Sequence, residues 1–373
     1  MRLNSSRRNR TIAAPDAFSY RALPTRVIFG RGARNEADGE LRDLDIRRPF
    51  VVASTEQSDT ARQFIDEAGL DNAVLHAQAR MHTPVVVTDA AHAELDRHGC
   101  DGLVAIGGGS AIGLSKALAA RTDLPQLILP TTYAGSEMTD ILGETDDGEK
   151  RTRRSPSIQP ETVIYDVELT LSLPVAISVR SGINAIAHAV EGLYAHDANP
   201  VSTVMGLEAI RLLKTALPAI ANDRNDLSAR SQAFLGSHLA AGVLGMVSMS
   251  LHHKLCHILG GTFDLPHAAV HSIMLPYTIA YNSNAARAAL APLENVFAGD
   301  IARGLFDLNR SLEINETLAD LNMREVDIDQ AVRMALANPY SNPAELEASA
   351  LRTLFKMAVN GEPPGPSSKA SSH

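Results

Sequence analysis

The densest group of residues able to do chemistry is the histidine-rich segment SLHHKLCHILGGTFDLPHAAVH, residues 250–271. His253 and His257 are four residues apart, which puts both on one face of a helix that we expect Gly260–Gly261 to end. His267 follows ten residues later, directly after a proline, near the start of the next expected helix. Imidazoles exchange protons near neutral pH, and the four-residue spacing is common in helical metal sites. The segment therefore predicts proton transfer or metal binding.

A second pair with the same spacing lies upstream, in SGINAIAHAVEGLYA, residues 181–195. We expect this segment to be a helix capped by Ser181, with Asn184 and His188 on one of its faces. Two helical pairs and His267 could converge on one polar centre. A single helical histidine usually has no chemical role, but this density favours one.

Two further histidines are weaker candidates. His252 points roughly 100° away from His253 on the same helix, so we place it behind the polar centre or on the surface. His271 lies one turn beyond His267 and is also a weaker candidate.

The elements that position these side chains change character halfway along the chain. Residues 18–173 alternate short apolar, β-branched runs with helical segments, which predicts an α/β dinucleotide-binding domain with a parallel, Rossmann-like sheet. Residues 174–361 show helical periodicity throughout and predict an all-helical catalytic domain, with a cleft between the two domains. The basic segment 1–17 and the Pro/Ser/Gly-rich segment 362–373 predict disordered tails.

A glycine turn follows one of the expected strands. Gly107, Gly108, Gly109 and Ser110 come after LVAI and lead directly into a helix. Glycines let a diphosphate approach the backbone, and the first amides of a helix donate to its oxygens. The GxGxxG fingerprint is not matched, so a merely tight connection is the alternative.

A second polar turn, PTTYAGSE at residues 130–137, ends another buried strand. Ligands of parallel α/β sheets lie at the carboxyl ends of strands, where the hydroxyls of Thr131, Thr132 and Ser136 could bond to ribose and phosphate. These residue types also cap helices, and both roles can belong to one residue.

The choice between NADH and NADPH depends on the end of the second expected strand. An acidic residue there would hold the ribose 2′-hydroxyl and repel a 2′-phosphate. The strand ends at Ser54 and Thr55, with no carboxylate before Glu56. We therefore expect both NADH and NADPH to be usable, unless another residue selects NADH.

Composition excludes several classes of partner. The formal net charge of −9 gives no basic surface for nucleic acid. The sequence has no run of eighteen apolar residues, so no membrane partner is expected. Two cysteines far apart suggest no disulfide framework and indicate a cytoplasmic protein, for which a homodimer is the default assembly.

Together these residues resemble the iron-containing alcohol dehydrogenase superfamily. Its metal-dependent members carry Asp-x-x-x-His, then His-x-x-x-His, then a histidine just after a proline. The resemblance assigns the four ligand positions to Asn184, His188, His253 and His267, and makes His257 an active-site histidine that is not a ligand. GGGS and PTTYAGSE match the cofactor loops of the superfamily, and Lys150 falls where a cofactor-contacting lysine is expected.

The departure from this pattern is Asn184, which stands where the metal-dependent members have aspartate. An all-neutral set with an amide is a poor ligand for divalent iron or zinc. Maleylacetate reductases, a branch that works without metal, look like this, and TTYAGSEMT, LHHKLCHILGGTFDLPHA and NPYSNP resemble their sequences. The resemblance covers residues 18–363.

This resemblance implies NAD(P)H-dependent reduction of a small dicarboxylate, maleylacetate, to 3-oxoadipate during the breakdown of aromatic compounds, without a metal. His257 or His267 would donate the proton, while His253, His188 and Asn184 would orient and polarise the substrate. The alternatives are a metal-dependent alcohol or glycerol dehydrogenase, a carbon–oxygen lyase of the dehydroquinate synthase type, and an inactive cofactor-binding paralogue.

Overall fold

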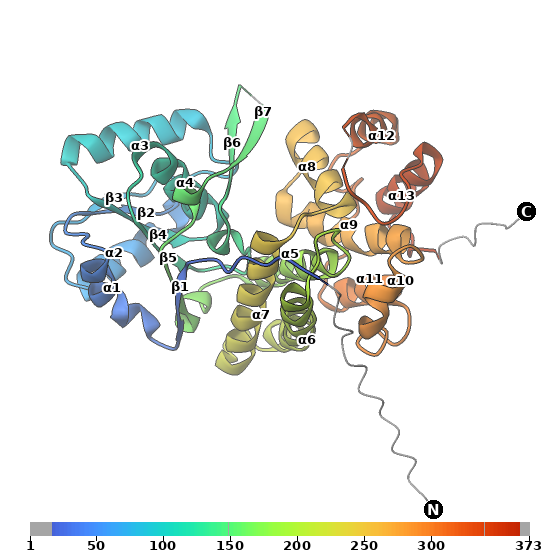
Figure 1. Ribbon diagram of the computed structural model, residues 1–373, viewed down its shortest axis with the longest axis horizontal. Helices are drawn as coiled ribbons and strands as arrows, with labels where there is room; N and C mark the ends of the chain where they lie inside the picture. Colours follow the sequence, from blue (N-terminus) through green and yellow to red (C-terminus); the bar gives the residue numbers. More distant parts are fainter. Residues whose placement is uncertain (1–16, 148, 339, 366–373) are drawn as a thin grey trace, which may run out of the picture.

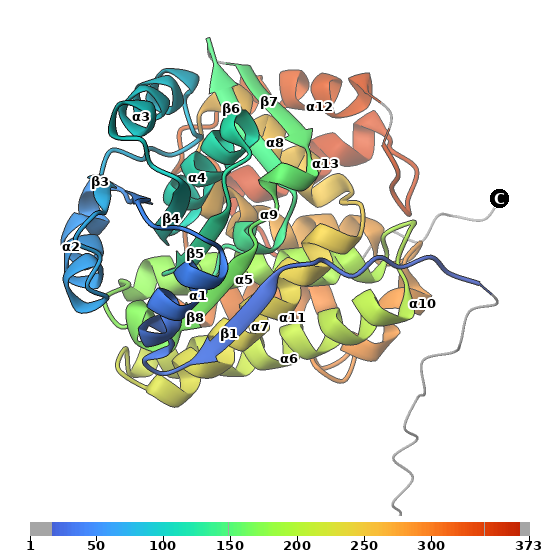
Figure 2. The same cartoon turned by 60° about the vertical axis from the view of Figure 1, so that its left-hand side comes forward.

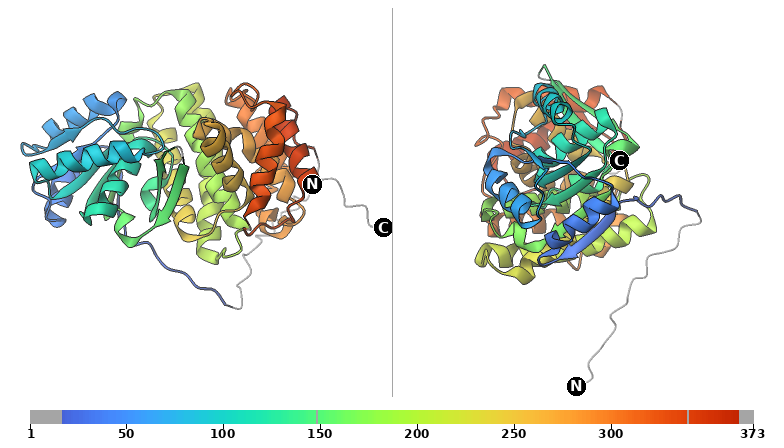
Figure 3. Two further views of the ribbon diagram at one scale, coloured as in Figure 1. Left: turned by 90° about the horizontal axis from the view of Figure 1, so that it is seen from above. Right: turned by 90° about the vertical axis from the view of Figure 1, so that its left-hand side faces the viewer.

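The computed structural model of the chain describes residues 17–147, 149–338 and 340–365. A sheet half and a helical half lie side by side along the long axis of the molecule (Figures 1 and 3). The predicted fold class, a parallel α/β domain followed by helices, is confirmed. The predicted domain boundary at residue 174 stays a prediction, as do the two tails, most of which lie outside the described residues.

The sheet half is built on six parallel strands in the order β1-β8-β5-β4-β2-β3. Figure 2 looks toward the edge that β1 forms. Continuous apolar runs such as GLVAIG are buried on both faces, as parallel strands with helices on each side must be. The strands are β1 (Arg26–Gly30), β2 (Pro49–Val52), β3 (Val74–His76), β4 (Gly102–Gly107), β5 (Gln126–Pro130) and β8 (Thr162–Asp166).

Helices cover both faces of this sheet. Alternate strand residues, such as Val104 and Ile106, pack against the short helices α1 (Ala37–Asp43) and α2 (Ser58–Glu67). Their neighbours, such as Leu103, pack on the opposite face in a cluster that includes α3 (Val85–His98) and α4 (Gly109–Thr122). The period-two alternation of strand side chains produces this division.

One hairpin was not predicted from the sequence. Strands β6 (Ile141–Asp146) and β7 (Glu149–Arg154) pair antiparallel outside the main sheet, and β6 packs beside α3 and α4 (Figure 2). The sequence EKRTRR of β7 has no apolar alternation, so its pattern carries no strand signal.

The helical half surrounds α5 (Val175–Leu193), which is buried along almost its whole length because other helices cover both its apolar and its polar faces. It packs against α6, α7 and α9. The other helices are α6 (Pro200–Asn222), α7 (Leu227–Met246), α8 (Leu251–Phe263), α9 (His267–Asn282), α10 (Arg287–Leu290), α11 (Ile301–Ser311), α12 (Ile328–Ala337) and α13 (Ala348–Asn360).

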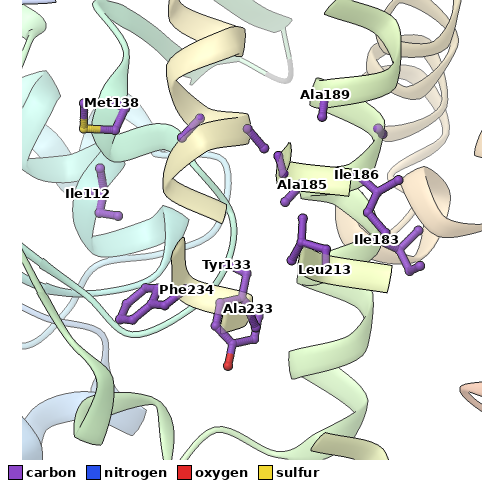
Figure 4. Packing of buried hydrophobic residues seen from close by; sticks show 14 of the residues in the cluster. Ile112, Tyr133, Met138, Ile183, Ala185, Ile186, Ala189, Leu213, Ala233 and Phe234 are labelled. Carbon is purple, nitrogen blue, oxygen red and sulfur yellow. The ribbon is translucent and has the colours of Figure 1, made fainter. Parts of the chain in front are cut away.

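The two halves share one apolar core. Ile112 of α4 and Met138 belong to the same buried cluster as Ile183 of α5 and Phe234 of α7 (Figure 4). This continuity fixes the two predicted cofactor loops against the histidine-bearing helices.

Two predicted helix ends are wrong. Helix α5 begins at Val175 after Pro174, two turns before Ser181, whose hydroxyl donates to the Ile177 carbonyl at 2.8 Å inside the helix. Helix α8 continues through Gly260–Gly261 and ends at Asp264, which takes the left-handed conformation (φ 53°). Glycine lowers helix propensity but does not stop a helix that is packed on its neighbours.

Membrane-spanning potential is low in the described part of the chain. No single helix there is long and apolar enough to cross a membrane; only the bent pair α7 and α8, which meet at 94°, passes by length and composition.

Candidate active site

The glycine turn and the second polar turn lie side by side at the carboxyl edge of the sheet. Gly107 at the end of β4 is level with Pro130 at the end of β5, and the amide of Thr131 donates to the Gly107 carbonyl at 3.0 Å. A Cβ on Gly108 would lie 2.8 Å from the Thr132 side chain, so only glycine fits there. Gly109 opens α4 with empty space beside its Cα. The first turn of α4 is therefore accessible to a phosphate group.

The remaining predicted cofactor residues surround this turn. Strand β2 pairs with β4, which brings Ser54 and Thr55 to the same edge of the sheet. A hydrogen bond with Ser54 lowers the pKa of the exposed Glu56. Thr131 is buried with its hydroxyl unpartnered, and Ser136 is half-buried. Lys150 lies on β7 opposite Thr145, but its side chain is outside the described residues.

Gly135 joins the polar turn to the histidine-bearing helices. Its φ is +89°, and a Cβ there would lie 3.1 Å from Ala241 and 3.4 Å from Nδ1 of His188. The second polar turn, which is the second predicted cofactor loop, therefore lies directly against helix α5.

Gly135→Ala should destabilise the fold because it adds both left-handed strain and a close contact. We expect the free energy of unfolding to fall by about 1–3 kcal/mol, measured by urea denaturation. Gly109→Ala is the matched control, since Gly109 has no left-handed conformation and no neighbour near its Cβ position. Equal stability of the two variants would contradict the expected strain.

The structure brings the predicted histidines together from three helices. The rings of His188 on α5 and His253 on α8 stack with centroids 5.0 Å apart. His257 lies 6.3 Å from His253, and His271 on α9 lies 5.1 Å from His253 and 4.3 Å from His267. The five rings thus form one contiguous cluster.

The members of this cluster differ in exposure. Asn184, His188 and His253 are buried, His267 is half-buried and His257 is exposed. Burial, reinforced by the neighbouring histidines, lowers the pKa of His188 well below its usual value, so this ring is neutral near pH 7. The gradient of exposure gives the cluster a buried inner part and a solvent-facing rim.

Glu191 is a site residue that the sequence interpretation missed. It is fully buried on α5, and its carboxylate accepts from His253 Nδ1 at 2.5 Å and from the His252 amide at 2.8 Å. The contact fixes the orientation of the His253 ring and leaves its buried Nε2 without a partner. Its position three residues after His188 was a usable signal, because such residues share a helix face.

His252 and His271 are both fully buried, so the surface alternative for His252 is wrong. His252 Nε2 lies 3.0 Å from His271 Nδ1, and His252 Nδ1 lies 3.1 Å from the Thr278 hydroxyl. The Thr278 hydroxyl lies 3.0 Å from the Leu275 carbonyl, to which it donates. Burial lowers the pKa of both rings well below the usual value, so both are neutral. Thr278 therefore accepts from His252 Nδ1, His252 accepts from His271, and the unpartnered His271 Nε2 carries no hydrogen.

The four residues at the superfamily's ligand positions lack the carboxylate of the metal-dependent members. Asn184 offers a neutral, unpartnered amide oxygen, and the other three are imidazoles, so the set holds no negative charge. Within the described residues, the one trio whose ligand atoms lie within 4.8 Å of one another is His252, Cys256 and His271. That trio is fully buried and lies behind the predicted set, and its two imidazoles are already joined by a hydrogen bond.

Comparison with known proteins gives matches over nearly the whole chain. Residues 24–167 match the iron-containing alcohol dehydrogenase family, and residues 178–359 match the C-terminal part of the Fe-containing alcohol dehydrogenase family. The maleylacetate reductase of Rhizobium sp. (strain MTP-10005) is 46% identical over 93% of this chain and 99% of its own length.

Solved structures agree with the sequence relatives. The crystal structure of maleylacetate reductase from Agrobacterium tumefaciens superposes with a TM-score of 0.90 at 46% identity, covering 94% of this chain and all of that one (100%). A putative alcohol dehydrogenase from Ralstonia eutropha JMP134 gives a TM-score of 0.92 at 44% identity, with coverage of 94% and 100%.

Proposed function

The chain belongs to the iron-containing alcohol dehydrogenase family, and from that premise we propose that this oxidoreductase reduces the carbon–carbon double bond of maleylacetate with NADH or NADPH. The product would be 3-oxoadipate, formed without a bound metal. The observation that carries the proposal is neutral Asn184, which replaces the carboxylate of the metal-dependent members beside an otherwise complete histidine set. The identity to maleylacetate reductases supports it.

The sheet edge fits a nicotinamide dinucleotide. Gly108 leaves the space that a Cβ would fill, Gly109 has open space beside its Cα, and the buried Thr131 hydroxyl is unpartnered. These groups would hold the diphosphate and ribose. A reduced nicotinamide, when bound, supplies a hydride to the alkene carbon β to the ketone of the substrate.

The histidine cluster would stabilise the negative charge that hydride addition produces. Hydride addition leaves negative charge on the ketone oxygen as an enolate, and hydrogen-bond donors aimed at that oxygen stabilise it. Glu191 accepts from His253 Nδ1, which orients the ring and leaves Nε2 as the nitrogen that would donate to the enolate oxygen when it carries a proton. His188 and Asn184 are neutral and would orient the substrate.

A proton must then reach the carbon α to the ketone. His257 and His267 lie toward solvent, where a ring that has lost a proton can regain one from water. We assign the proton donation to His257 or His267, with the buried rings polarising the substrate.

The decisive assay is oxidation of NADH or NADPH by the purified protein with maleylacetate after exhaustive chelation. We expect full turnover in the chelated enzyme, unchanged when iron or zinc is added back, because no step needs a Lewis acid. Metal content of the same sample is measured by mass spectrometry. Turnover that requires added metal would overturn the metal-free part of the proposal. Turnover of simple alcohols alone would show that maleylacetate is not the substrate.

One observation favours the metal-dependent dehydrogenase as the second candidate. His253 is oriented by a carboxylate with its Nε2 unpartnered, which is also how a metal-binding histidine is held. The add-back arm of the assay separates the two candidates. A homodimer and a cytoplasmic location stay predictions from the sequence.

A further inference from the structure

Lys116 is a fully buried lysine with no part in the reaction described above. It lies on α4, fewer than two turns after the glycine turn at its start. Its ammonium donates to the Ser136 carbonyl, to the Thr139 hydroxyl at 2.9 Å and to the Ile141 carbonyl at 3.1 Å. An ammonium has three N–H donors, and three oxygens receive them. All of these partners lie in the segment 136–141.

A buried carboxylate accompanies this lysine. Glu137 is also fully buried, and Tyr165 donates to its Oε1 at 2.9 Å. Burial lowers the pKa of Lys116 to about 7, whereas Glu137 and Asp140 oppose that shift. Lysine is rarely buried this completely, because removing its charge from water is unfavourable. A neutral apolar residue at this position would avoid that desolvation cost, but it could not bind the three oxygens of segment 136–141.

The segment held by Lys116 is the exit of the second cofactor loop. The entry of that loop is fixed by the bond from the Thr131 amide to the Gly107 carbonyl. Between the two ends lies Gly135, which rests against His188. Displacing residues 136–141 would move the second cofactor loop relative to both the glycine turn and the histidine cluster.

We propose that Lys116 is a positioning residue for cofactor binding, which clamps the exit of the 131–136 loop onto the phosphate-binding helix. This inference rests on the proposed function, since it assigns that loop to the nicotinamide cofactor. A purely structural lysine would support stability alone, whereas a clamp sets the affinity for NADH and the alignment of the bound cofactor with His188.

The test compares three variants of the full-length enzyme. Lys116→Met removes all three donors at similar length. Thr139→Val removes one acceptor of Lys116, together with the bond from that hydroxyl to the Ser136 carbonyl and the bond it accepts from the Ile141 amide, without changing shape. Ser115→Ala is the matched control: Ser115 is also fully buried on α4, but it bonds to Gln126 of β5 and not to the loop. The Kd of NADH is measured by its own fluorescence, which the absence of tryptophan in the chain simplifies.

We expect the Kd of NADH to rise about tenfold or more in Lys116→Met and severalfold in Thr139→Val, with a parallel fall in kcat. Ser115→Ala should lower Tm but keep the wild-type Kd within about twofold. If Lys116→Met does not fold, Thr139→Val decides the question alone.

Two outcomes overturn the inference in distinguishable ways. Wild-type Kd and kcat in Thr139→Val, and in Lys116→Met where it folds, would reduce Lys116 to a structural role and leave the proposed function intact. A wild-type enzyme that binds neither NADH nor NADPH would overturn the proposed function and the inference together.

Discussion

Glu191→Gln is expected to lower kcat for maleylacetate reduction by about 10²–10⁴-fold, because replacing the carboxylate behind a catalytic histidine by an amide costs up to about 10⁴-fold. The Glu191 carboxylate lies 2.5 Å from His253 Nδ1, and its side chain has no exposure to solvent. Because water does not reach the Glu191 side chain, its hydrogen bond to the ring is electrostatically stronger than it would be in water.

Glutamine keeps the size of this side chain but removes the charge. It can still accept from the His252 amide, which Glu191 binds at 2.8 Å. Its amide can accept from His253 Nδ1 or donate to it, but in either orientation it offers the ring no negative charge. The donor that faces the enolate is weakened, whereas the cofactor loops are untouched. We therefore expect KM for NADH to stay within about twofold of wild type.

Asp166→Asn is the matched control, because Asp166 is an equally buried carboxylate that pairs with Arg34 at the end of β8, on the sheet side. This variant should lose stability but keep kcat. Steady-state kinetics and Tm are measured for both variants. A Glu191→Gln enzyme with kcat within about fivefold of wild type would mean that His253 needs no carboxylate, and the proposed enolate stabilisation would then rest on other donors.

Much of the fold was predictable because its signals are local. The apolar run before Gly107 predicts a buried parallel strand, and β4 is that strand. The hairpin β6–β7 was not predictable, because its charged residues gain strand structure only by pairing with each other. The end of α8 was also missed, since tertiary packing outweighs the weak helix propensity of Gly260–Gly261.

The candidate site, like the fold, was predictable only where the signals are local. The four-residue spacings predicted the faces that carry His188 and His253, and the structure brings those rings together. His252 and His271 were underrated because their burial depends on how α8 packs against α9, which no spacing within one helix reveals. The spacing of Glu191 from His188 placed it on the same helix face, but its partner His253 is identified only when α8 is placed beside α5.

Asn184→Asp is expected to convert the cluster into a metal site and to lower metal-free reduction of maleylacetate by about 100-fold. The substituted carboxylate would occupy a position that is 4% exposed and whose Oδ1 is unpartnered. A buried carboxylate without a partner is strongly disfavoured, and a divalent cation bound with the three imidazoles relieves that penalty. Without metal, the same charge opposes the enolate that the cluster must stabilise.

The measurement is metal content by mass spectrometry together with kinetics before and after chelation. We expect about one equivalent of zinc or iron per chain in the variant after metal loading. Asn282→Asp is the matched control: it adds a carboxylate at a fully buried asparagine that bonds to Asn342, about 22 Å along α9 from His267. This control should gain no metal.

The trio of His252, Cys256 and His271 offers a rival place for any metal found. Asn184→Asp combined with Cys256→Ser separates the two places, because Cys256 contributes only to the rival trio. Metal retained in the double variant assigns it to the carboxylate at position 184, whereas metal lost assigns it to the trio. Full chelated activity in Asn184→Asp would contradict the proposed mechanism more directly, since a buried anion beside the enolate would then have no effect. Asn184 would in that case be neutral for reasons unrelated to metal-free reduction.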